Sequence, residues 1–291
     1  MYGRSLQLNT AQESPGMTST VELVTQIELK IRAGKRFAVY CLIPMFCESW
    51  PQEATPQEIL HFQFRTYEFM YKRIAKAIQD AGVPDAHPLD YLQFFCLGCR
   101  ETLEGSQHTA EPTSATEGSL QRKLNYSRRY MAYVHSKMMI VDDEYIMVGS
   151  ANINERSLAG DRDTELSTGM FQPEHVTEEM DDGTFKLPFG DVASFRRSLW
   201  AEHAKSTAGN PLLDAPESVE CVRYIRGVAS ANWDRYMSKE VVDMDEHLMP
   251  YPLEVLQDGT VQSIDGVEKY PDTDAAIVGL SANLVPDLLT S

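Results

Sequence analysis

The sequence lacks an apolar segment long enough to cross a membrane. Its longest apolar run, Phe37 to Cys47, contains Pro44, whereas a transmembrane helix needs roughly 20 apolar residues. Basic residues are also scarce, because 26 Lys and Arg stand against 43 Asp and Glu and leave a net charge of −17. Such an acidic chain is unsuited to general nucleic-acid binding or to unaided adsorption on an anionic bilayer. Any membrane contact is therefore expected to be peripheral.

Patterns for metals and disulfides are equally sparse. Five cysteines are scattered through the chain, and Cys96-Leu97-Gly98-Cys99 is a single C-x-x-C pair, which is weak evidence for zinc without a second pair. Calcium-loop spacing is absent, and the acidic cluster from Glu178 to Asp182 is interpreted as a solvated loop. An odd cysteine count and no secretory signal predict a reducing, cytoplasmic compartment. We expect no cofactor bound by this chain.

The most informative stretch runs from Val134 to Asp142 and continues through Gly149-Ser150-Ala151-Asn152. Two apolar, β-rich runs, 138–141 and 145–148, flank the acidic residues 142–144, and this pattern predicts a β-hairpin. The small residues Gly149 and Ser150 end the second strand and let the backbone approach a substrate closely. We therefore expect both to line a substrate-binding position, within reach of Asn152.

The residue types in this stretch suit attack on a phosphodiester. His135 and Lys137 are two apart on the expected strand, so their side chains point to the same face. Histidine titrates near neutrality and can act as nucleophile or general acid, while Lys137 and Asn152 can donate hydrogen bonds to phosphate oxygens as negative charge develops. Glu165, in the strand-like stretch 164–168, is the candidate to hold the other ring nitrogen. Asp142 has the opposite parity and is expected to support the motif by bracing the turn.

A His and a Lys on one strand are usually surface residues. The fixed Asp, the Gly-Ser-x-Asn tail and the downstream Glu together favour a catalytic site. His135-x-Lys137-x4-Asp142-x6-Gly149-Ser150-x-Asn152 resembles the HKD motif of the phospholipase D superfamily. Several stretches are similar to plant-type phospholipase D around and beyond its second HKD block: Phe94 to Gly98, Tyr133 to Tyr145, Gly149 to Ser157, Arg162 to Glu165, Ser198 to His203, and Pro271 to Pro286.

The resemblance implies an enzyme with two HKD half-sites, in which one histidine forms a phosphohistidine and the other protonates the leaving alcohol and later activates water. It also implies hydrolysis of phosphatidylcholine to phosphatidic acid and choline, with calcium possible for the full-length family enzyme. A second His-x-Lys-x4-Asp is absent from this sequence. We therefore expect the carboxyl-terminal half of such an enzyme, whose partner is a missing N-terminal half or a second copy of the chain.

Three interpretations stay open at this point. The chain is an incomplete phospholipase D, a homodimeric single-HKD phosphodiesterase in which two-fold symmetry brings two His135 rings together, or a catalytically inactive half that binds lipid or a partner. The acidic charge makes a nuclease less favoured than a lipid enzyme. In each case, an isolated half is expected to expose the apolar face that meets its counterpart.

Hydrophobic periodicity and element order predict a layered α/β fold. Together with this order, the resemblance implies a layered α-β-α phospholipase D-type half-domain with a mixed sheet and a C-terminal closing subdomain. We expect a disordered tail at 1–17, the HKD domain at 18–210, and a helical/strand subdomain of the same lobe at 211–291. The expected elements comprise helices at 18–33, 55–82 with Thr55 as N-cap, 192–205 and 218–239, buried strands at 36–43 and 91–97, and a long loop at 100–127. Apolar residues Ile59, Phe62 and Phe195 are expected to face the core.

Overall fold

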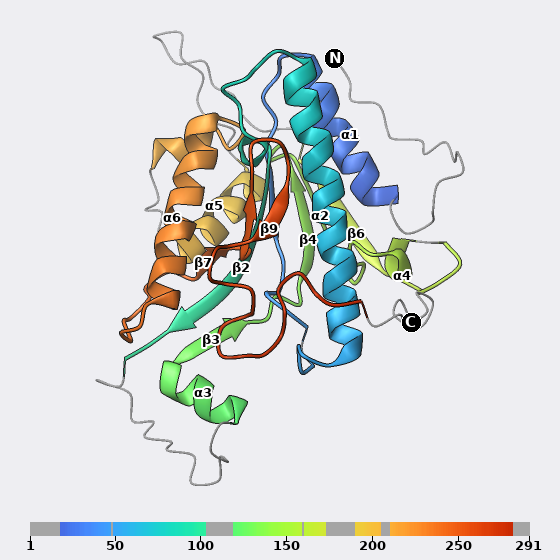
Figure 1. Cartoon of the computed structure of the whole chain (residues 1–291). Helices are drawn as coiled ribbons and strands as arrows, with labels where there is room; N and C mark the ends of the chain where they lie inside the picture. Colours follow the sequence, from blue (N-terminus) through green and yellow to red (C-terminus); the bar gives the residue numbers. More distant parts are fainter. Residues whose placement is uncertain are drawn as a thin grey trace.

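The computed structural model describes residues 18–47, 49–102, 119–158, 160–172, 190–204 and 210–281. Predictions for 1–17 and for the acidic cluster at 178–182 lie outside these residues. Helices α1 (Thr18–Arg32) and α2 (Ala54–Asp80) lie on one side of a central sheet, and α5 (Asp191–Ala204) and α6 (Val219–Met237) lie on the other (Figure 1). This arrangement confirms the layered α/β fold, and the four long helices match their expected ranges closely.

The central sheet is mixed, as expected. Strand β1 (Val39–Leu42) runs parallel to β2 (Leu92–Arg100), while β3 (Arg129–Ala132) and β7 (Leu248–Pro250) are antiparallel to β2. Because β7 joins the same sheet, the C-terminal segment shares its core with the preceding residues. Strands β8 (Leu253–Val255) and β9 (Val261–Ser263) form a separate two-stranded ribbon.

Short elements complete the described chain: η2 (Pro88–Asp90), α3 (Leu120–Ser127), α4 (Glu155–Leu158) and η3 (Pro211–Asp214).

Strand β2 lies at the centre of the core, with helices on both of its faces. On one face, residues at helical spacing from α1 and α2 pack with β2 and the β8–β9 ribbon, among them Val24, Ile27, Tyr67, Met70 and Ile74. On the other face, Cys221, Ile225 and Ala229 of α6 pack against Phe95. A strand buried on both faces is largely apolar, which explains the sequence LQFFCLGCR of β2, where Gln93 and Arg100 are the polar exceptions.

Several local predictions were wrong. Helix α2 begins at Ala54 with Glu53 at the N-cap and no side-chain cap, so Thr55 is not the cap. Pro56 is accommodated because the first-turn N–H groups of a helix have no intrahelical acceptor. The first strand spans only 39–42 and is half-buried, and α3 interrupts the expected loop. Ile59, Phe62 and Phe195 are exposed.

A second sheet carries the motif. Strands β4 (Lys137–Val141), β5 (Tyr145–Gly149) and β6 (Ser167–Phe171) pair antiparallel in the order β4-β5-β6, which confirms the expected hairpin. Met138 and Met139 are neighbours on opposite faces of β4, and 40% and 47% of their surfaces are exposed. Both faces of this sheet are therefore partly uncovered within the described structure.

Candidate active site

The predicted site residues other than Asp142 lie at or beyond one edge of the β4–β5–β6 sheet. Lys137 begins β4, Gly149 ends β5 and Ser167 begins β6, and the register pairs Lys137 with Gly149 and Gly149 with Ser167. Because the strands are antiparallel, the segments before β4, after β5 and before β6 all leave the sheet at this edge. These segments carry His135, Ser150 and Glu165, which are separated by up to thirty positions in the sequence.

Lys137 and His135 are joined directly. The Lys137 Nζ donates a hydrogen bond to the His135 carbonyl oxygen at 2.6 Å. His135 itself precedes β4 and is exposed, so the strand alternation that was expected to align the two side chains does not apply. The His135 ring lies 6.1 Å from the Tyr133 ring, centroid to centroid, at an interplanar angle of 31°. The ammonium group thus fixes the backbone of the histidine, while the imidazole stays open to a substrate.

Ser150 links the end of β5 to the segment before β6. Its hydroxyl donates to the Glu165 carboxylate and accepts a hydrogen bond from the Leu166 N–H at 3.0 Å, while its own N–H donates to the Leu166 carbonyl at 3.0 Å. The hydroxyls of Ser150 and Ser157 hydrogen-bond the Glu165 carboxylate and, with the positive charge of Lys137, lower the pKa of Glu165. Glu165 is therefore held as an anion at the site edge.

Glu165 precedes β6, because this strand begins at Ser167 and not at Thr164, where the expected stretch 164–168 starts. No hydrogen bond joins Glu165 to the His135 ring in the described part of the chain, where the carboxylate instead accepts from Ser150. Both residues leave the sheet at the same edge. The role of Glu165 in orienting the histidine stays a prediction.

Asn152 lies two residues beyond Ser150 in a loop closed by groups that the sequence reasoning missed. The Asn152 N–H donates to the Ser157 hydroxyl at 3.0 Å. Arg156 and Asp163 close the loop with an ion pair at 2.7 Å. The available sequence signal was an Asn154-x-x-Ser157 helix start, in which the Asn154 side chain accepts the Ser157 N–H at 3.0 Å. The Asn152 side chain is exposed, and in the described residues no hydrogen bond ties it to another predicted site residue.

Gly149 and Asp142 have roles in the sheet itself. A Cβ on Gly149 would meet the Leu166 carbonyl oxygen at 2.6 Å, so glycine permits close approach of β6. Asp142 lies in the β4–β5 turn with φ 52°, at the far end of β4 and ~16 Å from the Lys137 backbone by strand geometry. This position fits a residue that braces the turn rather than one that touches a substrate.

Comparison with known proteins decides the family. The family model for phospholipase D matches residues 8–279. The chain belongs to the phospholipase D family. Phospholipase D beta 2 of Arabidopsis thaliana is 44% identical over 264 residues, which cover 89% of this chain and 27% of the relative. Phospholipase D alpha 1 of Zea mays is 43% identical over 271 residues, which cover 93% of this chain and 32% of the relative.

Phospholipase D beta 1 of Arabidopsis thaliana is similar to the same extent, at 45% identity over 263 residues, and 24% of its length is covered. The chain therefore spans about a quarter to a third of the length of the curated relatives that it matches. Family membership is shown for this stretch.

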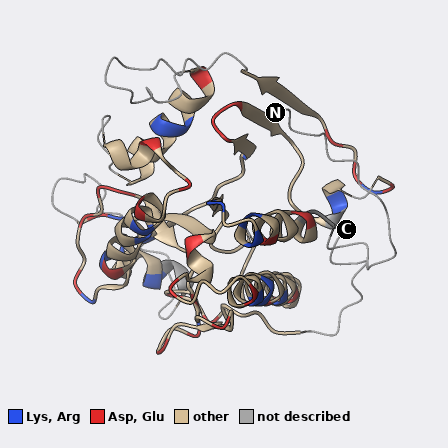
Figure 2. Cartoon of the chain, turned by 90° about the horizontal axis from the view of Figure 1, so that it is seen from above, with Lys and Arg blue, Asp and Glu red and all other residues tan. Residues whose placement is uncertain are grey.

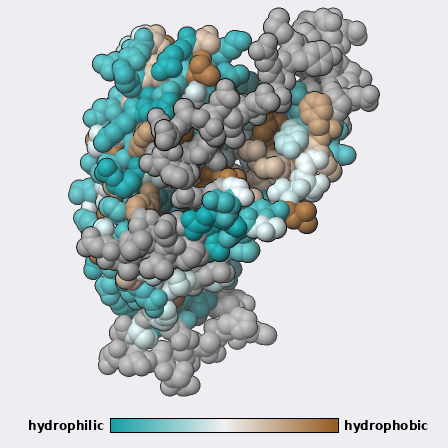
Figure 3. Space-filling model, turned by 90° about the vertical axis from the view of Figure 1, so that its right-hand side faces the viewer, coloured by the Kyte–Doolittle hydropathy of each residue, from teal (hydrophilic) through white to brown (hydrophobic). Residues whose placement is uncertain are grey.

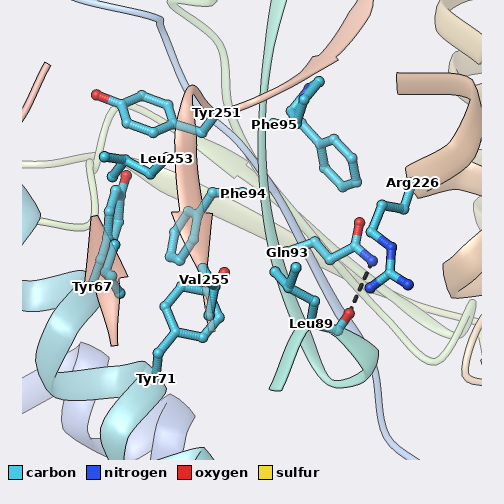
Figure 4. Close-up of a pocket in the computed structure, with 12 residues that line it drawn as sticks. Tyr67, Tyr71, Leu89, Gln93, Phe94, Phe95, Arg226, Tyr251, Leu253 and Val255 are labelled. Atoms are coloured by element: carbon cyan, nitrogen blue, oxygen red, sulfur yellow. Dashed lines mark hydrogen bonds between the residues drawn. The ribbon is translucent and has the colours of Figure 1, made fainter. Parts of the chain in front are cut away.

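A cavity of about 60 Å³ lies apart from the site, inside the core. Figure 4 shows its aromatic wall, with Tyr67 and Tyr71 from α2 facing Phe94 of β2, and Gln93 and Arg226 on the opposite side. Gln93 is held by the Leu89 carbonyl oxygen at 2.9 Å. None of the predicted site residues lines this cavity, which we interpret as a packing void of the core.

The described residues were also compared with the requirements of a metal site and of a membrane-spanning helix. In the residues that the structure describes, no three His, Cys, Asp or Glu side chains form a group able to hold a metal ion. Over the same residues, no helix combines the length and apolar character needed to span a bilayer.

Proposed function

We propose that this chain supplies one half-site of a phospholipase D-type phosphodiesterase. The complete site hydrolyses phosphatidylcholine to phosphatidic acid and choline through a phosphohistidine intermediate. The observation that supports this proposal is the gathering of His135, Lys137, Ser150 and Glu165 at one sheet edge, in a chain that belongs to the phospholipase D family.

The proposed chemistry assigns a role to each group. A ring nitrogen of His135 attacks phosphorus, a P–N bond forms, and the P–O bond to choline breaks as a second acid protonates the leaving alcohol. Water then attacks the phosphohistidine, loses a proton to that same second group, and releases phosphatidic acid. With only one HKD motif present, His135 can equally serve as the acid-base partner of a nucleophile supplied from elsewhere.

Lys137 and Asn152 would stabilise the negative charge on the phosphoryl oxygens. Donors placed in advance where charge develops are often the largest catalytic contribution, and losing one costs roughly 2.7–4 kcal/mol in studied acyl-transfer enzymes. Lys137 is already held beside His135 by its 2.6 Å hydrogen bond. Glu165 is kept ionised by its serine donors. After a side-chain rearrangement, its carboxylate would accept a hydrogen bond from the second ring nitrogen of His135.

The uncovered sheet supports the need for a second half-site. Strands β4 and β5 read KMMIV and YIMVG, and continuous apolar runs of this kind are typical of strands buried on both faces. Met170 and Phe171 of β6 are nevertheless 58% and 62% exposed. On the side of the molecule that carries α4 and β6, hydrophobic residues reach the surface (Figure 3). A missing N-terminal half, or a second copy of the chain, would cover them and bring the second histidine.

The substrate places the complete enzyme at a phospholipid bilayer surface. Acidic residues stand beside basic ones on the helices (Figure 2), and the net charge is −17. Unaided attraction to anionic lipid is therefore weak. We propose peripheral contact with a zwitterionic surface, in the cytoplasm, with any calcium bridging supplied outside the described residues.

The test is choline release from phosphatidylcholine vesicles by the purified chain, over a hundredfold range of protein concentration, with His135→Ala as the control. Release that rises with the square of concentration and disappears in His135→Ala supports a homodimeric site, and sedimentation must then show a dimer. Silence alone, with activity on adding a polypeptide that carries the first HKD half-site, supports an incomplete chain. Vesicle binding without choline release, both by the chain alone and with the added half-site, would refute the proposed activity. It would favour the interpretation of a catalytically inactive half that binds lipid.

A further inference from the structure

The β4–β5 hairpin is attached to the helical layer at the end opposite the site. The attachment begins with the turn after β4, which the Glu144 N–H closes by donating to the Val141 carbonyl at 3.0 Å. Both central residues have positive φ, 52° at Asp142 and 59° at Asp143, as in a type I′ turn. Asp142 is exposed, whereas only 5% of Asp143 is exposed. The backbone of the turn therefore directs the Asp143 carboxylate into the protein and the Asp142 carboxylate into solvent.

The buried carboxylate meets a buried guanidinium on α5. Arg196 Nε and Nη2 donate to the two Asp143 oxygens at 2.6 and 2.8 Å, and 7% of Arg196 is exposed. The same guanidinium donates to the Leu213 carbonyl at 3.0 Å and lies 4.6 Å from the centre of the Trp200 ring. A two-pronged pair that is also stacked and bonded to backbone has one orientation, because the planar fork matches the carboxylate in a single geometry.

A second contact reinforces the same end of the sheet. The Gln172 N–H, just beyond β6, donates to the Glu144 carbonyl at 2.8 Å. The Gln172 side chain accepts the Val192 N–H, in the first turn of α5, at 3.2 Å. The turn and the end of β6 are therefore both fixed to α5, and the site edge lies at the other end of the strands.

We propose that Asp143 and Arg196 are positioning residues, which set the direction of the hairpin and so the place of the His135–Lys137 edge. Over a strand length of ~16 Å, a rotation of about 10° at the turn displaces the far end by roughly 3 Å. A misplacement of even ~1 Å can reduce catalysis by on the order of 100-fold. The catalytic consequence rests on the proposed function, whereas the mechanical consequence does not.

Removing one partner leaves the other as an uncompensated buried charge. Asp143→Asn is a nearly isosteric change, and Asn tolerates positive φ as Asp does. Arg196→Gln removes the fork from the other side. The matched control is Arg197→Gln, because Arg197 is the next residue of α5 and its guanidinium lies 2.8 Å from the Asp214 carboxylate, in η3 rather than in the sheet.

The experiment is hydrogen–deuterium exchange on the full chain, with peptides covering 137–149 compared with peptides covering β2. In Asp143→Asn and in Arg196→Gln, exchange in 137–149 is expected to rise on the order of 100-fold while β2 stays protected. The double variant is expected to go no further than either single variant, because the pair acts as one unit. Arg197→Gln is expected to leave 137–149 unchanged.

The histidine side chain provides the second readout. The His135 Cε1–H resonance, assigned by its loss in His135→Gln, is expected to shift in Asp143→Asn and not in Arg197→Gln. Unchanged exchange and an unmoved resonance in both single variants would overturn the proposal, as would an equal rise of exchange in β2, which indicates general destabilisation. Failure of choline release by the wild-type chain, both alone and with an added polypeptide that carries the first HKD half-site, would refute the proposed activity without altering these readouts. Where release is observed, the positioning role predicts a fall in kcat with KM unchanged.

Discussion

Replacing Arg100 by methionine is expected to loosen the C-terminal end of α6. Only 2% of Arg100 is exposed. Its guanidinium donates to the Ser127 carbonyl at 2.8 Å and to the carbonyls of Arg235, Tyr236 and Ser238 at 3.0, 3.3 and 2.7 Å. Arg235 and Tyr236 lie in the last turn of α6 and Ser238 is its C-cap, where helix carbonyls have no intrahelical donor. Arg100 therefore caps α6 from the end of β2.

The magnitude follows from the bonds lost and the charge removed. A hydrogen bond to a charged group contributes about 1.5–3 kcal/mol. Because the two Nη1 hydrogens are shared among three carbonyls, the bonds together amount to about three and contribute roughly 4.5–9 kcal/mol. Removing a buried cation returns several kcal/mol of desolvation cost. The net loss expected for Arg100→Met is ~3–5 kcal/mol, which lowers Tm by roughly 6–20 °C at 2–4 °C per kcal/mol.

The assay is thermal unfolding followed by circular dichroism, with Arg65→Met as the control. The Arg65 side chain is 64% exposed and pairs with Glu68 at 2.6 Å, and an exposed pair of this kind contributes about 1 kcal/mol or less. Arg100→Lys is expected to fall between the wild type and Arg100→Met, since a lysine reaches fewer carbonyls. A Tm for Arg100→Met within about 2 °C of the Arg65→Met value would contradict the capping role.

Three further outcomes are expected. Burial alone would raise the pKa of Asp90, but hydrogen bonds from Arg223 and from backbone hold this pKa below its usual value. The resulting stability is present above the unfolded-state pKa of about 3.9 and is lost as pH falls through the folded pKa; acid unfolding of Asp90→Asn should show a flatter pH dependence below about pH 4. Gly149→Ala, whose Cβ would meet the Leu166 carbonyl oxygen at 2.6 Å, should increase amide exchange at the start of β6, and unchanged exchange would refute the close contact. Val255 lines the core cavity, so Val255→Ile should raise urea stability by up to ~0.8 kcal/mol, and a loss of stability would show that the cavity cannot take a methylene.

Elements with long periodicity or a strong turn signal could be predicted from the sequence. The four long helices follow from apolar spacing, and the β4–β5 hairpin follows from two apolar runs around Asp142-Asp143-Glu144. Helix α3 was missed because its surroundings are rich in Ser, Thr, Gly and Glu, and such composition indicates a loop. Phe195 was misplaced because helical spacing does not show which face of α5 meets a neighbour.

The candidate site was predictable in its residue types but not in its contacts. The pairing of Lys137 with Gly149 could be predicted from the length of the hairpin, because antiparallel strands around a short turn pair in a fixed register. The ammonium-to-carbonyl bond at His135 and the serine donors of Glu165 depend on segments that leave the strands, whose paths have no periodic signal. The Asp143–Arg196 pair joins positions 53 residues apart, and nothing local in the sequence connects them.

The methionines of the uncovered sheet have a chemical consequence. Met138, Met139 and Met170 are 40%, 47% and 58% exposed, and an accessible thioether is readily oxidised to the polar sulfoxide. Peroxide labelling followed by mass spectrometry would therefore act as a footprint, since any polypeptide seated on these strands would shield the sulfur atoms. The same reaction sets a practical condition, because peroxide present during purification would make the surface hydrophilic and weaken association with the polypeptide that covers it.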